Sequence, residues 1–543
     1  MDFKKSVVYQ IYPRSFMDSN QDGIGDLQGI IQKLDYIKNL GVDIIWLSPI
    51  YKSPDKDNGY DISDYYDISY KFGTLADFNE LLAKAHEKGL KIVMDLVVNH
   101  TSDQHPWFQE SKSSKTNPKR DYYIWRDGCG DKAPTTQFGF FNESVWEYDQ
   151  TTDQYYMHNF AVQQPDLNWE NEEVRKAVYN MMNYWLEMGV DGFRMDVISL
   201  LSKPEEALRN DGGLGKSCAN GPRIHEFLQE MKRETFAKYG SFTVGETAEV
   251  TLEEAAKYGN AEGTELDMVF HFELVSAADD ATLGKWQTKK VAMKDFKEIT
   301  NRWQKGLFNK AWNSLYLSNH DQPRQVSRFG NTDTKRNWEK SAKMLATVMH
   351  LQQGTPYVYQ GEELGMTNFK ITSLNDCDDY EVFSSYKNLV ENKKLTTHDD
   401  FIAALNERCR DHARTPMQWN AGANAGFTTA TPWLKVNPNY TEINAEAQVN
   451  DQNSIYNYYK KLIALRKEVE CIVDGDFNLV LPENDDIFAF TRQNKDSKIT
   501  VVANFTSKTM AMPLALEGAL LIGNYNDASK ELRPYEVLVY LQK

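Results

Sequence analysis

Cysteine is scarce in this chain, and its spacing excludes two classes of protein. The five cysteines among 543 residues are odd in number, scattered, and never form a Cys-x-x-Cys pair. A disulfide framework and a cysteine-ligated zinc site are therefore not expected, and a reducing compartment is favoured.

Positive charge and long apolar runs are also in short supply. The 78 Asp and Glu residues outnumber the 61 Lys and Arg residues, and the formal net charge of −17 argues against nucleic acid or an anionic membrane as a partner. No run of 18 apolar residues occurs, and the first ten residues lack the apolar core of a signal peptide. We therefore expect a cytoplasmic protein without a membrane partner, which acts as a monomer on a neutral small molecule.

The chain does contain a repeated alternation of helix-like and strand-like segments. Apolar residues at helical spacing in 30–40 are followed by Gly41 and by the apolar run 42–47, and the same order recurs around Gly89 and Gly189. This order is typical of βα units with buried parallel strands. The strand candidates are 7–12, 44–48, 92–98, 192–197, 242–245, 268–272, 314–317 and 356–359. Since eight parallel strands close a barrel, the sequence predicts an α/β fold, a (β/α)8 TIM barrel.

Three segments depart from this alternation and divide the chain. Residues 102–165 are rich in Pro, Asp, Asn, Gln, Trp and Tyr and lack a helical period, which predicts a subdomain inserted after the third strand. A second irregular insertion is expected at 368–431, after the eighth strand. Short alternating runs separated by turn residues predict a C-terminal antiparallel β-sandwich domain at 471–543. The catalytic barrel would then occupy 1–101 and 166–470.

Polar or charged residues end several of the strand-like runs. The segments concerned are 59–61, 95–100, 192–197, 244–246 and 318–321. Because the C-terminal ends of parallel strands meet at one face of a barrel, acidic side chains there can assemble a catalytic site. A single aspartate at a strand end is more often a helix cap or a turn residue, but such segments in succession point to one sugar-cleaving site.

The carboxylates in these segments fit glycoside hydrolysis with retention, which needs a carboxylate nucleophile and a carboxylic acid about 5–5.5 Å apart. We assign Asp196 as the nucleophile, because Arg194 lies two residues earlier on the same face of the strand and favours an ionised carboxylate. Glu246 follows small and apolar neighbours and is the candidate acid/base. Asp321 is a third carboxylate, suited to accepting hydrogen bonds from sugar hydroxyls and to stabilising positive charge at the anomeric carbon.

Further residues are candidates for binding the sugar. His100 and His320 can donate hydrogen bonds to it, and neither has the His-Glu-x-x-His neighbours of a zinc site. Asp61 and Arg414 are weaker candidates by themselves, since Asp61 also suits a turn and Arg414 also suits the surface.

A loop after the first strand carries oxygen ligands at alternate positions, namely Asp18, Asn20, Asp22 and Asp26. This spacing predicts a hard cation, calcium, with magnesium as the alternative. An EF-hand would need Glu at the twelfth position, which is Gly29, so a calcium sensor of that type is excluded. A polar loop of Asx turns is the competing interpretation. We expect a structural role, because the loop holds no nucleophile candidate.

Taken together, these motifs resemble glycoside hydrolase family thirteen, the α-amylase family, over essentially the whole chain. The resemblance implies that Asp196 is the nucleophile, Glu246 the acid/base and Asp321 the transition-state stabiliser. The glucose site would also include His100, Arg194 and His320. The implied calcium ligands are Asp18, Asn20, Asp22, the carbonyl group of Ile24, and Asp26.

Three segments narrow the resemblance to one subgroup of the family. Residues 164–168, Gln-Pro-Asp-Leu-Asn, resemble a motif of the oligo-1,6-glucosidase and dextran glucosidase group, and Val197 is similar to the valine of members that act on α-1,6 bonds. Residues 414–419 resemble the segment whose arginine, here Arg414, would hold the non-reducing end of the glucose together with Asp61. The chain lacks the Arg-Leu-Asp-Arg-Asp stretch of sucrose-isomerising relatives, which favours hydrolysis.

The resemblance therefore implies a retaining, exo-acting α-glucosidase that releases glucose from the non-reducing end of isomalto-oligosaccharides by hydrolysing α-1,6 bonds. An α-1,4-glucosidase and a trehalose-6-phosphate hydrolase are the alternatives within the family, although no cluster of cationic residues indicates a phosphate site. A non-enzymatic barrel homologue is the alternative outside it, and such a protein should have lost carboxylates or gained a membrane anchor.

Overall fold

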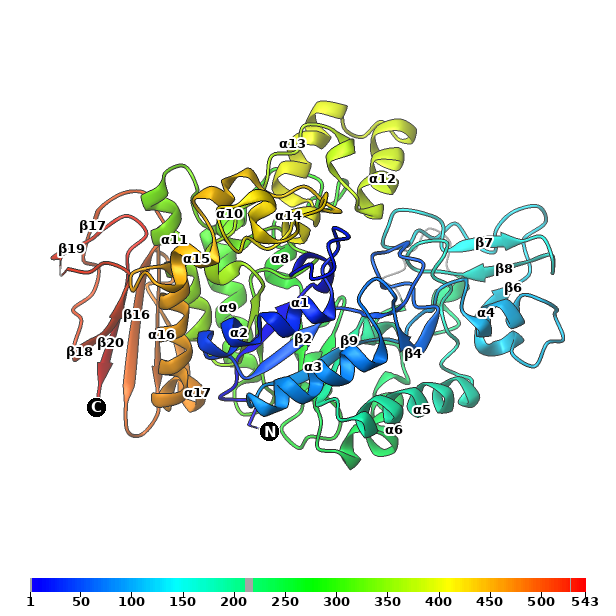
Figure 1. The fold of residues 1–543 in the computed structure, drawn as a ribbon. Helices are drawn as coiled ribbons and strands as arrows, with labels where there is room; N and C mark the ends of the chain where they lie inside the picture. The colour runs from blue at the N-terminus through cyan, green and yellow to red at the C-terminus, as the bar shows by residue number, and fades with distance from the viewer. Residues whose placement is uncertain (1, 210–217, 528) are drawn as a thin grey trace.

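Eight parallel strands form a closed barrel at the centre of the computed structural model, which describes residues 2–209, 218–527 and 529–543 (Figure 1). The strands are β1 (Val8–Ile11), β2 (Ile44–Leu47), β5 (Lys91–Val97), β9 (Gly192–Asp196), β10 (Phe242–Glu246), β11 (Met268–Phe270), β12 (Ser314–Leu315) and β13 (Thr355–Tyr359). Seven of the eight neighbouring pairs in the ring form regular ladders, including β13 with β1, and a bridge between Val269 and Asn313 joins β11 to β12. The predicted (β/α)8 barrel and its eight strands are confirmed.

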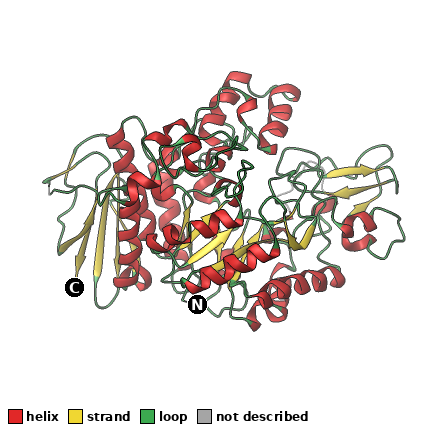
Figure 2. Ribbon diagram, in the orientation of Figure 1, coloured by secondary structure: helices red, strands yellow, loops and turns green. Residues whose placement is uncertain are grey.

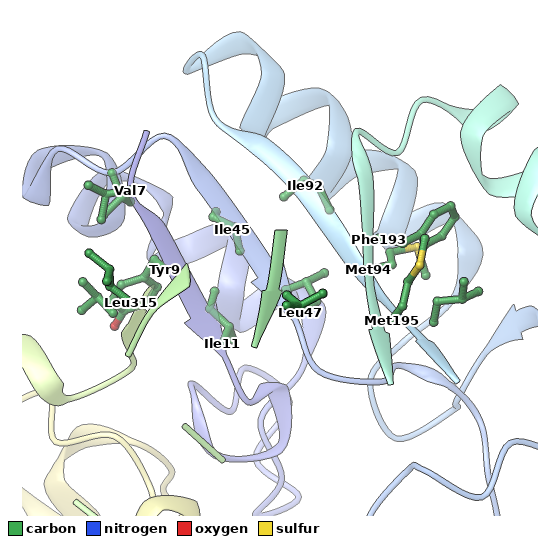
Figure 3. Packing of buried hydrophobic residues seen from close by; sticks show 14 of the residues in the cluster. Val7, Tyr9, Ile11, Ile45, Leu47, Ile92, Met94, Phe193, Met195 and Leu315 are labelled. Atoms are coloured by element: carbon green, nitrogen blue, oxygen red, sulfur yellow. The ribbon is translucent and has the colours of Figure 1, made fainter. Parts of the chain in front are cut away.

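Side chains along each strand alternate between the inside of the barrel and its outer face. In β1, Val8 packs in the interior cluster, whereas Tyr9 and Ile11 belong to the larger core between the strands and the helices. The same alternation turns Arg194 and Asp196 of β9 to the inside. Figure 3 shows residues of the outer core on neighbouring strands, among them Ile45, Leu47, Ile92, Met94, Phe193 and Met195.

Helices cover the outside of the barrel (Figure 2). Helix α3 (Leu75–Glu87) begins with a capping box, in which Thr74 and Asp77 each accept a hydrogen bond from the other's backbone N–H group. Helix α5 (Glu172–Met188) ends at Gly189, whose φ of 111° suits glycine. Other helices are α1 (Leu27–Gln32), α2 (Leu34–Leu40), α6 (Ile224–Glu234), α9 (Met293–Leu307), α11 (Lys335–His350) and α16 (Ile455–Glu468).

The segment after β5 forms a small subdomain of its own. It contains α4 (Pro106–Ser111) and a three-stranded antiparallel sheet of β6 (Trp125–Arg126), β8 (Gln154–Met157) and β7 (Trp146–Asp149). A bridge between His100 and Asp166 joins the two ends of the segment. This bridge places both ends of the subdomain beside the C-terminal end of the barrel strands.

The segment after β13 was predicted to be irregular, and that prediction is wrong. It folds into α12 (Tyr380–Tyr386), a π-helix at Lys387–Asn392, α13 (His398–Arg408) and α14 (Asp411–Arg414). These helices share a separate apolar core that includes Val382, Leu389, Phe401 and Leu405. The helical period was not recognised in the sequence because the apolar stretch of each helix is short. We call this segment the helical insertion.

The C-terminal region is antiparallel, as predicted. Its main sheet has the order β14 (Asp476–Val480), β15 (Ile487–Gln493), β16 (Lys498–Asn504), β20 (Val537–Gln542) and β18 (Ala519–Gly523). The second layer is only a ribbon of β17 (Met510–Ala511) and β19 (Glu531–Leu532). Arg492 of β15 is fully buried and donates hydrogen bonds to the carbonyl groups of Ile472 (2.7 Å) and Leu351 (3.2 Å), which ties the sheet to the helices of the barrel.

None of the helices in the described ranges is both long and apolar enough to cross a membrane. None of the five cysteines forms a disulfide bond.

Candidate active site

The carboxylates predicted from the sequence meet at one cavity at the C-terminal end of the barrel. Asp196 ends β9, Glu246 ends β10, and Asp321 lies in the loop after β12. The cavity has a volume of about 60 Å³. Its lining consists of Asp57, Tyr60, His100, Phe141, Phe160, Asp196, Val197, Glu246, Asp321 and Arg410. Apolar rings and charged groups share the lining, as in small-molecule sites.

Arg194 holds three carboxylates in place beneath the cavity. Its guanidinium donates hydrogen bonds to Asp95 (2.8 Å), to Asp196 (2.9 Å) and to Glu246. Arg194 is almost completely buried, and its guanidinium lies 5.1 Å from the centre of the Trp46 ring. One guanidinium therefore fixes the relative positions of the candidate nucleophile and the candidate acid/base.

The three carboxylates outnumber the single guanidinium, which affects their ionisation. Burial raises the pKa of Asp95 to about 6, against the opposing effect of Arg194. Burial, and then the negative charges of Glu246 and Asp95, raise the pKa of Asp196 as well. Arg194 does favour ionisation of Asp196, as expected, but burial and the neighbouring carboxylates outweigh this effect. The carboxyl groups of Asp196 and Glu246 are also in contact, as an acid and nucleophile pair requires.

Asp321 is in the opposite electrostatic situation. Burial opposes its ionisation, but His320 (3.1 Å), Arg410 (3.1 Å) and Arg414 (2.8 Å) surround its carboxylate and hold its pKa well below the ordinary value. Asp321 therefore remains a fixed negative charge at the edge of the cavity.

The two candidate histidines are neutral donors. Burial lowers the pKa of His320 to about 3 and that of His100 to about 4. Gln10 donates to Nδ1 of His320 at 2.8 Å, which leaves the proton on Nε2, facing the Tyr60 hydroxyl at 2.6 Å and Asp321. In His100, Nε2 lies 3.1 Å from the carbonyl oxygen of Tyr60 and therefore carries its proton too.

The wall of the cavity is formed by residues that the sequence interpretation missed. Asp57 lines the cavity from the loop between β3 (Tyr51–Lys52) and β4 (Asp64–Ile68), and Arg410 lines it from the helical insertion. Their charged groups are 3.7 Å apart. Two oxygens of Asp379 accept hydrogen bonds from Nε (2.8 Å) and Nη2 (2.5 Å) of Arg410, which fixes the plane of the guanidinium.

Asp61 and Arg414, which were predicted for this role, lie behind that wall. Asp61 is in a loop, not at a strand end, and its carboxylate accepts hydrogen bonds from the backbone N–H groups of Lys56 (2.9 Å) and Asp57 (3.1 Å). Burial raises its pKa to about 7. Arg414 is fully buried and donates to the His320 carbonyl group (3.0 Å). Neither side chain lines the cavity, although both position residues that do.

The Gln-Pro-Asp-Leu-Asn motif connects the inserted subdomain to the cavity. Gln164 donates a hydrogen bond to Asp57 (3.1 Å), and its amide nitrogen lies 3.2 Å from Nε2 of His100. Asp166 in the same motif accepts from Asn159 (2.7 Å) and pairs with Lys203 (3.3 Å). The motif therefore orients Asp57, a residue of the cavity lining, from outside the cavity.

Val197 follows Asp196 in an unusual backbone conformation. Its φ of 36° and ψ of 40° lie in the left-handed region, which is strained for a β-branched residue. Its backbone N–H donates to Glu246 at 3.3 Å, and its side chain forms part of the cavity lining. The strained turn thus brings a branched apolar side chain between the two candidate catalytic carboxylates.

The predicted metal loop consists of successive Asx turns. Side-chain oxygens of Asp18, Asn20 and Asp22 each accept the backbone N–H two residues later, at 3.0, 3.0 and 2.8 Å. Asp26 instead caps α1, since its carboxylate accepts from Gly29 N–H (2.7 Å). The carboxylates of Asp18, Asp22 and Asp26 do not come within 4.8 Å of one another as a group. The donor set of the first three residues, all oxygen, fits a hard cation.

The loop is also attached to a distant segment. Thr428 donates a hydrogen bond to Asp18 at 2.5 Å, and the Gly23 carbonyl group accepts from Trp433 N–H at 3.0 Å. A side chain at Gly23 would collide with the carbonyl oxygen of Thr431, since a Cβ atom would lie 2.1 Å from it. The loop therefore joins the first barrel strand to the end of the helical insertion.

Comparisons with known proteins agree over the full length of the chain. Residues 10–475 match the family model described as "Alpha amylase, catalytic domain". The chain is 52% identical to an oligo-1,6-glucosidase of Parageobacillus thermoglucosidasius (99% of this chain, 98% of that protein) and 50% identical to one of Bacillus cereus (100% and 99%). Among solved structures, a Bacillus licheniformis trehalose-6-phosphate hydrolase superposes with a TM-score of 0.93 at 47% identity, over 99% of each chain.

Proposed function

Because the chain belongs to the alpha-amylase family, we propose that it is a retaining, exo-acting α-glucosidase that hydrolyses α-1,6 bonds at the non-reducing end of isomalto-oligosaccharides. The observation that carries the proposal is the meeting of Asp196, Glu246 and Asp321 at one enclosed cavity. Identity of about half the residues with two oligo-1,6-glucosidases over the full chain supports the substrate class. The enzyme is a glycoside hydrolase.

The proposed chemistry is a double displacement at the anomeric carbon. Asp196 attacks this carbon and forms a glucosyl ester, while Glu246 donates its proton to the glycosidic oxygen and the bond to the leaving sugar breaks. The Glu246 carboxylate then takes a proton from water, whose oxygen displaces Asp196 and releases glucose. The contact between the carboxyl groups of Asp196 and Glu246 places nucleophile and acid/base at one anomeric carbon. The anion at Asp321 would stabilise the positive charge that develops on the sugar ring.

The closed wall of the cavity supports cleavage at a chain end. Asp57 and Arg410 come from different loops and face one another at 3.7 Å, with Phe141 beside the guanidinium at 5.5 Å. A terminal glucose could hydrogen bond to both charged groups, but a continuing glucan chain would have to pass through them. The pair would therefore bind the non-reducing end and limit the enzyme to one glucose at a time.

Val197 supports the choice of an α-1,6 bond. Its side chain lies beside Asp196 and Glu246 and is held there by the left-handed turn. The leaving sugar of an α-1,6 bond is joined through a flexible methylene group, which packs well against a branched apolar side chain. An α-1,4-linked leaving sugar presents a secondary hydroxyl carbon and its neighbouring hydroxyl groups at the same place.

The test is glucose release from isomaltose and from maltose at equal concentrations of purified protein. A strong preference for isomaltose supports the proposal, and a preference for maltose would retain the enzyme class while refuting the linkage. Trehalose 6-phosphate is the third substrate in the assay. Its preferred hydrolysis would replace the proposal by the alternative within the family.

We also propose that the Asp18 loop binds calcium as a structural ion. Asp18, Asn20, Asp22 and the Ile24 carbonyl group would supply the ligands, and Asp26 would support them as the cap of α1. The ion would fasten the loop to the segment around Thr428 and would take no part in the reaction.

Two further expectations concern the state of the protein in the cell. We expect a monomer, since segments of a single chain supply the whole cavity lining. We expect it in the cytoplasm, where the five cysteines, none of them in a disulfide, would stay reduced. Size-exclusion chromatography with light scattering and cell fractionation test these expectations.

A further inference from the structure

Two cysteines and an aspartate meet inside the helical insertion, outside the sugar-binding cavity. Cys377 follows a short 3-10 helix (Leu374–Asp376), Cys409 follows α13, and Asp411 begins α14. One ligand atom from each residue, the two Sγ atoms and a carboxylate oxygen, lies within 4.8 Å of the other two. The three residues are 8%, 0% and 0% exposed. We call them the thiol–carboxylate cluster.

The two carboxylate oxygens of Asp411 differ, because one accepts hydrogen bonds and the other has no partner. Oδ2 accepts hydrogen bonds from the backbone N–H groups of Asp378 (2.8 Å) and Asp379 (3.2 Å). Oδ1 is buried and has no hydrogen-bond partner. Burying an acceptor without a partner costs free energy, on the order of 1–3 kcal/mol, so a cation beside this oxygen would stabilise it.

We propose that Cys377, Cys409 and Asp411 bind a zinc ion. Thiolates are soft ligands that select zinc over calcium or magnesium, and a carboxylate oxygen is a common further ligand of zinc. Ligand atoms about 2.0–2.3 Å from a tetrahedral ion lie roughly 3.3–3.8 Å from one another, so the cluster needs only a small contraction to reach that spacing. A water molecule would complete the four ligands.

Binding would require both thiols to lose their protons. Burial, and then contact with Cys377, raise the pKa of Cys409 well above its ordinary value, so Cys409 carries a thiol in the metal-free cluster. Zinc would replace two thiol protons, and its charge of +2 would be set against two thiolates and one carboxylate. Affinity should therefore increase with pH.

The cluster is linked to the sugar site through two residues. The backbone N–H of Asp379 donates a hydrogen bond to the Asp411 carboxylate. The Asp379 carboxylate accepts hydrogen bonds from Nε (2.8 Å) and Nη2 (2.5 Å) of Arg410. Arg410 in turn contacts Asp321 at 3.1 Å. A zinc ion would draw Asp411 toward the thiolates. Asp379, whose backbone N–H donates to Asp411, would move with it, and the Arg410 guanidinium that Asp379 holds would be displaced. We expect zinc to lower kcat/KM about tenfold, the equivalent of weakening one hydrogen bond to the sugar.

The first experiment uses cadmium as a spectroscopic probe on the full-length protein, kept reduced with a phosphine. Cadmium bound to thiolates absorbs in the ultraviolet, whereas cadmium on the oxygen ligands of the Asp18 loop does not. We expect the band in the wild type and in the Cys129→Ser control, whose thiol is exposed and alone. We expect Cys377→Ser to lose most of it, and zinc to displace it from the wild type. An equal band in Cys377→Ser and wild type would overturn the proposal.

A second measurement needs no variant and so does not depend on one folding. Iodoacetamide alkylation of each cysteine in the wild type is followed by peptide mass spectrometry, with and without zinc. Zinc should slow alkylation of Cys377 and Cys409 and leave Cys129 unchanged. Equal rates with and without zinc would refute the site. Inhibition of isomaltose hydrolysis by zinc that is the same in wild type and Cys377→Ser would refute the link to Arg410.

Discussion

Replacement of Asp57 by asparagine tests whether this residue binds the sugar. Asn has nearly the same size, and its amide oxygen can still accept the hydrogen bond from Gln164, which is 3.1 Å long in the wild type. Burial raises the pKa of Asp57, so removal of the charge also removes a desolvation penalty. Arg410 keeps its contacts with Asp379 and Asp321. The fold should therefore tolerate the substitution.

The expected loss is in catalysis. A hydrogen bond between a carboxylate and a sugar hydroxyl contributes about 1.5–3 kcal/mol, which corresponds to a decrease in kcat/KM of about 10- to 150-fold. The assay is initial-rate hydrolysis of isomaltose, with thermal unfolding measured on the same preparation. If the interaction forms with the bound substrate and with the transition state alike, the loss will lie in KM.

Asp55→Asn is the matched control. Asp55 lies two residues earlier in the same loop, pairs with Lys71, and does not line the cavity. Its φ of 59° is one that asparagine adopts readily. We expect Asp55→Asn to retain wild-type kcat/KM. The reasoning is refuted if Asp57→Asn stays within about 3-fold of the wild type, or if both variants lose activity equally.

Four other predictions follow from the structure. Asp196→Asn should keep the circular dichroism spectrum and lose about 10⁴-fold or more in kcat, and wild-type turnover would exclude Asp196 as nucleophile. Val197→Thr keeps the branched shape and adds a hydroxyl beside the catalytic pair, so the ratio of kcat/KM for isomaltose over maltose should fall about tenfold; an unchanged ratio contradicts the role of Val197. Chelation with EDTA should lower the Tm, and added calcium should restore it. Calcium at 100 times its Kd would stabilise the folded state by about 2.7 kcal/mol, and an unchanged Tm argues against a bound ion. Burial raises the pKa of Glu362 from 4.5 to about 8, so its stabilising contribution is present below pH 4.5 and lost as pH rises through about 8. Glu362→Gln should therefore gain in Tm over the wild type between about pH 5 and about pH 9, and parallel Tm profiles would refute the shift.

The barrel could be predicted from the sequence because its strands are buried on both faces. In β5 and β9 nearly every residue is apolar or belongs to the site, and each strand follows a helix that ends at a glycine. The helical insertion could not be predicted in the same way. In α13 the buried apolar positions Phe401, Ala404 and Leu405 span little more than one turn, with charged residues before and after them, and so short an apolar stripe is a weak signal for a helix.

The placement of the candidate carboxylates Asp196 and Glu246 in the barrel could be predicted for the same reason as the strands, since strand alternation gives the direction of each side chain. The wall of the cavity could not, because loop residues follow no such period. Asp55, Asn58 and Gly59 have φ values of 59°, 48° and 100°, and these left-handed turns direct Asp57 into the cavity and Asp61 back into the loop. Arg410 and Arg414 are four residues apart and reach the same oxygen of Asp321, so sequence spacing alone does not tell which one meets the substrate.

The left-handed backbone at Val197 has a consequence for protein engineering. Glycine and asparagine both adopt such a φ more easily than valine, so either would relieve strain of about 1–3 kcal/mol. A directed-evolution campaign that selects only for heat tolerance would therefore favour replacements at Val197, and it would discard the branched side chain beside the catalytic carboxylates. Thermostable variants of this enzyme should accordingly be screened for substrate preference in the same round, or codon 197 should be held fixed.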